Sequence, residues 1–159
     1  MALSKQAIGE LGENLPESRF TGIVNLNTFH KNFPLFDHLA YLDGQLYVFT
    51  TKSRSKYGRN GKQNVSYNLL PANATRKFHT ACALLRGHGY DPSAARYGFI
   101  VSRLDPETPT TTYYWGELSD IKPGCCYTTL NDGTVRRVCL PTKDSDLESY
   151  KVLGTRVRE

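Results

Sequence analysis

The sequence predicts a mixed α/β domain of the α+β kind with a largely antiparallel sheet. Two segments have apolar residues at helical spacing, roughly six others are rich in β-branched and aromatic residues, and an Asp-Gly pair joins two of these. The 159 residues suffice for one well-packed domain and are few for two. With no internal repeat or low-complexity linker, residues 1–159 are predicted to form a single domain.

A helix is expected over residues 4–15, because Ser4 can cap its start and Pro16 follows its end. Its apolar face would carry the residues at helical spacing, Ile8, Leu11 and Leu15. The β-branched and aromatic content of residues 20–29 then predicts a strand.

Residues 36–54, "FDHLAYLDGQLYVFTTKSR", predict two strands joined at Asp43-Gly44, a strong signal for a tight hairpin. The polar, basic and glycine-bearing residues 53–64 predict a loop.

A second helix is expected within residues 72–90, ending near Gly87 or Gly89. The apolar segment 96–104 predicts a central strand, and "TTYYWGEL" predicts the next. A further hairpin is expected from "CCYTTL" and "TVRRVCL", and "KDSDLESYKVL" predicts a short closing helix.

Composition favours an anionic partner, since the net charge is +5 and the pI near 9.0. No apolar run reaches the length of a membrane span, and the first fifteen residues lack the apolar core of a signal peptide, so a cytoplasmic location without a membrane partner is expected. The four cysteines lack zinc-ligand spacing and are expected to be free thiols.

An acid, a threonine and a lysine are expected to meet at one end of the predicted hairpin. Turning at Asp43-Gly44 brings Asp37 opposite Thr50, and Lys52 shares a strand face with Thr50. Phosphodiester hydrolysis requires a hard cation with oxygen ligands and positive charge near the phosphorus, which Asp37 and Lys52 can supply. The alternative is structural: an aspartate capping a turn and a lysine at a strand end.

The stretch resembles the PD-(D/E)XK, or restriction-endonuclease-like, nuclease superfamily. "AIGELGE" resembles its helix motif, with Glu10 as the match, and "PLFDHLAYLDGQLYVFTTKSRSKYG" resembles the pattern of Holliday-junction resolvases and related endonucleases. The resemblance implies a central mixed sheet flanked by helices and a DNA endonuclease that uses Mg²⁺ or Mn²⁺. It also implies Asp37 and Glu10 as metal ligands and Lys52 as the catalytic lysine.

Thr50 is the departure from the family pattern, which has an acid, or in some branches a glutamine, at this position. A threonine hydroxyl is a neutral and weak ligand for Mg²⁺. Three outcomes stay open: Glu10 or Glu13 compensates, the metal binds weakly, or the site is inactive.

The segment from Lys52 through Lys62 predicts a nucleic-acid-binding surface, because it contains five basic residues and no acid. The candidates for DNA contact are Arg54, Lys56, Tyr57, Arg59, Lys62 and Gln63. The alternative is an ordinary solvated loop.

Two side-chain sets are expected to be structural. His38 should face away from Asp37 on its strand, and Tyr113, Tyr114 and Trp115 should pack in the sheet rather than stack on bases.

Three functional classes follow. The first is a metal-dependent DNA endonuclease, which for a small chain that cuts duplex DNA implies a homodimer or higher homo-oligomer. The second is a catalytically inactive nucleic-acid-binding protein that retains the nuclease fold. The third is a structural or interaction protein.

Overall fold

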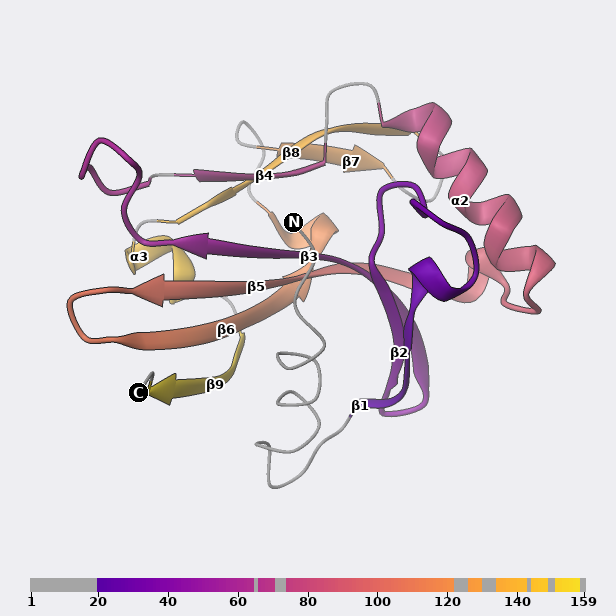
Figure 1. The fold of residues 1–159 in the computed structure, drawn as a ribbon. Coiled ribbons are helices and arrows are strands. Elements are labelled where there is room, and N and C mark those ends of the chain that lie inside the picture. Colours follow the sequence, from indigo (N-terminus) through magenta and orange to yellow (C-terminus); the bar gives the residue numbers. More distant parts are fainter. Residues whose placement is uncertain are drawn as a thin grey trace.

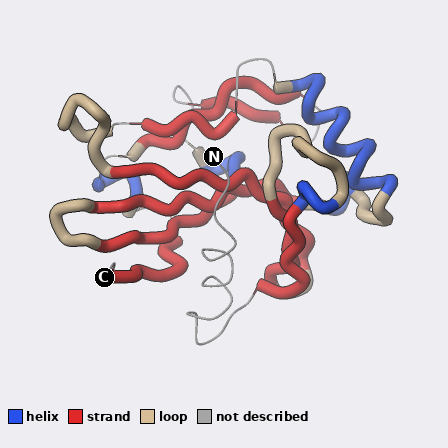
Figure 2. The backbone as a smooth tube through the Cα atoms, viewed as in Figure 1, coloured by secondary structure: helices blue, strands red, loops and turns tan. Residues whose placement is uncertain are grey.

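The structure, a computed structural model, describes residues 20–64, 66–70, 74–121, 126–129, 134–142, 144–148 and 151–157. The predicted helix over residues 4–15, with Glu10 and Glu13, lies outside the described residues. A large twisted sheet carries a helix and a second, smaller sheet on one of its faces (Figures 1 and 2).

The large sheet has six strands in the order β1-β2-β3-β5-β6-β9. Its strands are β1 (Phe20–Asn25), β2 (His38–Leu42), β3 (Gln45–Ser55), β5 (Arg96–Asp105), β6 (Thr110–Glu117) and β9 (Lys151–Val157). The β3–β5 pair is parallel and the other four pairs are antiparallel. The predicted α+β class with a central, largely antiparallel mixed sheet is confirmed, as is the central position of β5.

The second layer contains α2 (Thr75–Gly87) and a three-stranded antiparallel sheet in the order β4-β8-β7. These strands are β4 (Ser66–Leu70), β8 (Thr134–Pro141) and β7 (Cys126–Thr129). Four short helices lie in the connections between strands: η1 (Leu26–Thr28), η2 (Pro92–Ala94), η3 (Leu118–Asp120) and α3 (Asp144–Leu147). Across the described ranges, no helix is long and apolar enough to span a membrane.

Alternation along β3 and β5 divides the apolar residues between two cores. Val48 and Phe99 face α2 and the small sheet, where they join the larger core with Phe78. On the opposite face Phe49 packs in a smaller core with Trp115, and Tyr113 belongs to the same cluster. Tyr114 is partly buried against the larger core, so the expectation that the three aromatic residues of β6 pack in the sheet is confirmed.

The hairpin predicted at Asp43-Gly44 is confirmed and joins β2 to β3. Both turn residues have positive φ, 50° and 82°. These angles suit a two-residue turn whose twist matches that of the strands.

Three predicted boundaries are wrong. The strand over residues 20–29 ends at Asn25, whose side chain accepts the Asn27 N–H and starts η1. The loop predicted over residues 53–64 begins later, because pairing with β5 continues to Ser55. Beyond α3, residues 151–157 form β9 rather than more helix, because they pair with the edge of β6.

We predict that Gly98→Ala destabilises the fold. An added methyl group would lie 2.8 Å from the Gly116 carbonyl oxygen and 3.0 Å from the Phe49 ring. Such overpacking should lower the free energy of unfolding by about 1–3 kcal/mol, measured by urea denaturation. Gly87→Ala is the control, since nothing lies within 4 Å of its added methyl group; wild-type stability in Gly98→Ala would contradict the prediction.

Candidate functional site

The candidate site lies where β2 separates from β3. The two strands pair from Leu42↔Gln45 to His38↔Phe49. The residues before His38, which connect η1 to β2, do not continue this pairing as a strand. The Asp37 N–H donates to the Phe49 carbonyl at 2.9 Å, and the Asp37 carbonyl accepts the Leu26 N–H at 2.9 Å. The backbone of Asp37 is therefore fixed on both sides.

The carboxylate of Asp37 completes the edge of β3. Its Oδ2 accepts the Thr51 N–H at 2.9 Å, in place of the carbonyl that a longer β2 would have offered. The N–H and C=O of a strand residue point to the same edge, so the Thr51 carbonyl is directed toward the side on which the carboxylate lies.

Thr50 and Lys52 lie on β3 on either side of Thr51. They are paired with Phe99 and Val101, two members of the larger core, and so share the face toward α2 and the small sheet. Lys52 is half-buried, and no ion pair joins it to Asp37 within the described part of the chain. The structure thus brings Asp37, Thr50 and Lys52 to one end of the β2–β3 pair.

Thr50 has an unsatisfied hydroxyl group. The residue is 0% exposed, and its Oγ1 has no hydrogen-bond partner among the described residues. A buried hydroxyl without a partner costs about 1–3 kcal/mol, and such atoms in native proteins call for an explanation, of which an ion or a catalytic role is one.

His38 supports the site from the other face of the sheet, as its expected orientation requires. Its Nδ1 lies 3.3 Å from the Thr51 Oγ1, and its buried Nε2 has no partner among the residues that the structure describes. Burial lowers the pKa of His38, and the charge of Asp37 opposes this effect. The contact between His38 and Thr51 was missed from sequence, although strand alternation places both side chains on this face.

The segment after β3 forms a basic hairpin, defined here as residues 56–63. Tyr57 pairs with Gln63, and the Gly58 N–H donates to the Lys62 carbonyl at 2.8 Å. Gly61 has a φ of 75°, which favours glycine at the tip. The predicted loop therefore contains a defined hairpin over residues 56–63.

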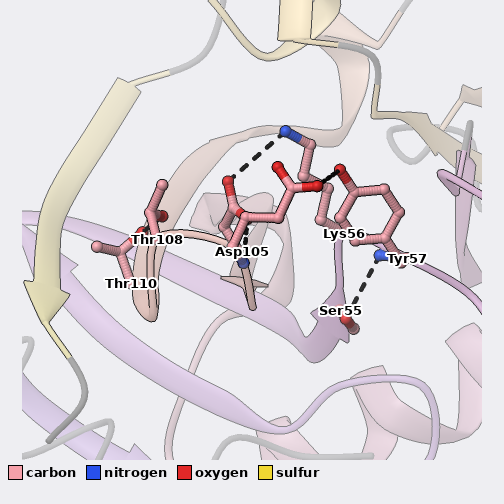
Figure 3. A network of polar contacts seen from close by, with 7 residues as sticks. Ser55, Lys56, Tyr57, Asp105, Thr108 and Thr110 are labelled. Carbon is pink, nitrogen blue, oxygen red and sulfur yellow. Dashed lines mark hydrogen bonds and ion pairs between the residues drawn. The ribbon is translucent and has the colours of Figure 1, made fainter. Parts of the chain in front are cut away.

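The predicted DNA-contacting side chains differ in their surroundings. Arg59, Lys62 and Gln63 are exposed. Arg54 donates from Nη1 to the Ser53 carbonyl at 2.8 Å. Lys56 and Tyr57 contact acidic residues of the β5–β6 turn (Figure 3).

The oxygen atoms at the place where β2 separates from β3 are of the types that bind a hard cation. They are the Asp37 carboxylate, the Thr51 carbonyl and the Thr50 hydroxyl, and Mg²⁺ and Mn²⁺ prefer such ligands. Within the described ranges, no group of three His, Cys, Asp or Glu residues could hold a metal ion. The second predicted ligand, Glu10, lies outside those ranges.

No family model and no curated protein matches the chain. Among solved structures, it is similar to Hjc of Archaeoglobus fulgidus, a Holliday junction resolvase from an archaeal hyperthermophile. The identity is 14% over 92% of this chain and 88% of that chain, with a TM-score of 0.46.

We predict that Thr50→Val stabilises the protein. Valine has nearly the same shape and removes the buried hydroxyl that lacks a partner. The free energy of unfolding should rise by about 1 kcal/mol in metal-free buffer, measured by urea denaturation. Thr80→Val is the control, because the Thr80 hydroxyl is exposed and donates to the Arg76 carbonyl; a loss of stability in Thr50→Val would show that its hydroxyl has a partner.

We predict that stability falls as the pH drops below about 6.5, the ordinary pKa of histidine. Because the pKa of His38 is lower in the folded state, the unfolded chain binds more protons between the two pKa values, which favours unfolding there. Urea denaturation from pH 7.5 to 5 should show a smaller pH dependence for His38→Gln. His79→Gln, at an exposed position on α2, should keep the wild-type dependence; equal slopes in all three proteins would exclude His38 as the cause.

Proposed function

We propose that this protein is a metal-dependent endonuclease that hydrolyses phosphodiester bonds in DNA. One observation carries the proposal: Asp37 Oδ2 accepts a hydrogen bond from the Thr51 N–H at 2.9 Å. Thr51 directly precedes Lys52, so the carboxylate is fixed beside the strand position of the lysine. A fixed carboxylate and an ammonium group at one strand end provide a metal ligand and a positive charge for the same phosphate.

Asp37 would hold the cation, with the Thr51 carbonyl as a second ligand and Glu10 as the third. The Thr51 N–H uses one oxygen of the Asp37 carboxylate, and no described residue donates a hydrogen bond to the other, Oδ1, which would hold the cation. A bound Mg²⁺ or Mn²⁺ supplies Lewis acidity toward the phosphoryl oxygen and lowers the pKa of a water ligand.

Lys52 would stabilise the negative charge that develops on the phosphate oxygens in the transition state. It is half-buried on β3, and electrostatic attraction is stronger in such a partly desolvated position than in bulk water.

The DNA duplex would run along the basic hairpin. A net charge of +5 favours a polyanion in general, and the exposed Arg59 and Lys62 place part of that charge beyond the end of β3. Cleavage of both strands requires two sites, so we propose a homodimer or higher homo-oligomer as the active form.

A second candidate function is favoured by Thr50. A neutral hydroxyl stands where the resemblance expects an acid, and within the described ranges no three His, Cys, Asp or Glu residues come together to hold a metal ion. In this alternative the chain binds nucleic acid through the same surfaces and does not cut it.

We predict that Asp37→Asn and Lys52→Ala each reduce cleavage of branched and supercoiled DNA at least a hundredfold in the presence of Mg²⁺ or Mn²⁺. Gel-based cleavage assays measure the loss. The matched controls Asp91→Asn and Lys31→Ala, at exposed positions, should cleave like the wild type.

A Thr50→Glu variant separates the two candidates. Greater cleavage by this variant shows a site that retains its geometry and lacks an acid. If the wild type binds DNA and neither it nor Thr50→Glu cleaves, the binding function stands and the endonuclease is refuted.

A further inference from the structure

The cations of the basic hairpin fall into two groups. Arg59 and Lys62 are exposed at the tip, and neither side chain makes a hydrogen bond or ion pair with any described residue. Lys56 lies at the base, where its Nζ is 3.6 Å from Asp105 Oδ2. The tip is available to a ligand, whereas the base is bound to the protein itself.

The base of the hairpin contacts the turn between β5 and β6, which we call the acidic turn (residues 105–109). The Tyr57 hydroxyl donates to Glu107 Oε1 at 2.7 Å, and Lys56 pairs with Asp105. Figure 3 shows the side chains of Lys56 and Tyr57 directed toward this turn. Two adjacent residues of the hairpin thus contact two acids that lie about fifty positions later in the chain.

The acidic turn has its own internal order. Asp105 Oδ1 accepts the Glu107 N–H at 3.0 Å, and the hydroxyls of Thr108 and Thr110 lie 2.7 Å apart. Asp105 therefore holds the backbone of Glu107 with one oxygen and Lys56 with the other. The carboxylate of Glu107 is presented to Tyr57 from a fixed backbone.

Main-chain hydrogen bonds also fix the base of the hairpin. The Asn64 N–H donates to the Lys56 carbonyl at 2.9 Å, and the Lys56 N–H donates to the Leu104 carbonyl at 2.7 Å. Thr142 adds a bond from its hydroxyl to the Asn64 carbonyl at 2.8 Å. These bonds fix the base of the hairpin, and among the described residues the Tyr57–Glu107 bond is the side-chain hydrogen bond to the rest of the protein that lies nearest to the tip.

Two carboxylates beside a nucleic-acid-binding tip are electrostatically unfavourable, because they repel the phosphate backbone. They can favour binding only by holding Lys56 and Tyr57, and with them the basic hairpin, in place. A hydrogen bond to a carboxylate is about twice as strong as a neutral one, and a segment fixed in its bound conformation loses less entropy on association.

We propose that Glu107 is a positioning residue for DNA binding: through Tyr57 it holds the basic hairpin so that Arg59 and Lys62 meet the phosphate backbone. The inference rests on the proposed function, in either its catalytic or its binding form. It assigns to an acidic residue a favourable effect on the binding of a polyanion, opposite in sign to the effect of its charge.

The sign of this effect provides the test. Binding of a fluorescent 30-base-pair duplex is measured by anisotropy at 50–200 mM salt for the wild type, Glu107→Ala, Glu107→Gln and Tyr57→Phe. Glu107→Ala and Tyr57→Phe should each weaken binding by about threefold to tenfold. The double variant should bind like either single one, because both remove the same hydrogen bond.

Glu148→Ala is the matched control, since it removes an exposed acid after α3. It should bind DNA as tightly as the wild type or slightly more tightly. Glu107→Gln keeps an oxygen that can accept from Tyr57 and should stay within twofold of the wild type. Arg59→Ala and Lys62→Ala should each remove one phosphate contact. Each should therefore reduce the slope of log Kd against log salt concentration by roughly 0.9.

The outcomes separate this inference from the proposed function. If the wild type binds DNA but Glu107→Ala binds equally well or more tightly, as Glu148→Ala is expected to, the inference is overturned and the proposed function stands. A wild type that neither binds nor cleaves DNA overturns both. Weakened binding by Glu107→Ala with wild-type binding by Glu148→Ala, at unchanged urea midpoints, supports the inference.

Discussion

The hydrogen bond from the Thr51 N–H to the Asp37 carboxylate, at 2.9 Å, is the contact on which the candidate site depends. β2 begins at His38, two residues short of the position that would lie opposite Thr51, and the side chain of Asp37 accepts the Thr51 N–H instead. Without it the N–H at the edge of β3 would lose its partner, and the carboxylate would lose its fixed position. The same bond that completes the sheet therefore orients the candidate metal ligand.

The two faces of β3 next to this hydrogen bond carry different kinds of side chain. Thr50 and Lys52 face the larger core, so the chemical groups project toward α2 and the small sheet. On the other face His38 contacts Thr51 and supports the strand from behind. The candidate chemistry is thus confined to one face, and the opposite face contributes packing and one buried imidazole.

Local sequence signals predicted the elements that depend on local chemistry, and they missed those that depend on pairing. The Asp43-Gly44 hairpin follows from two turn residues that accept positive φ, and α2 follows from the spacing of its apolar residues. The extension of β3 to Ser55 and the strand β9 depend on partners distant in the sequence. In the same way, the convergence of Asp37 on the Thr50–Lys52 segment was predictable, whereas the links from Lys56 and Tyr57 to the acidic turn were not.

Under the proposed function, β3 sets the length of DNA that the protein would contact, because it carries Lys52 and continues into the basic hairpin. Tyr57 follows Lys52 by five positions, a distance of roughly 17 Å along an extended strand, which matches about five base pairs of duplex. An insertion of two residues here would lengthen that span by about two base pairs. An insertion of one residue would turn the hairpin to the opposite face of the sheet, so the length of this strand can change only in steps of two.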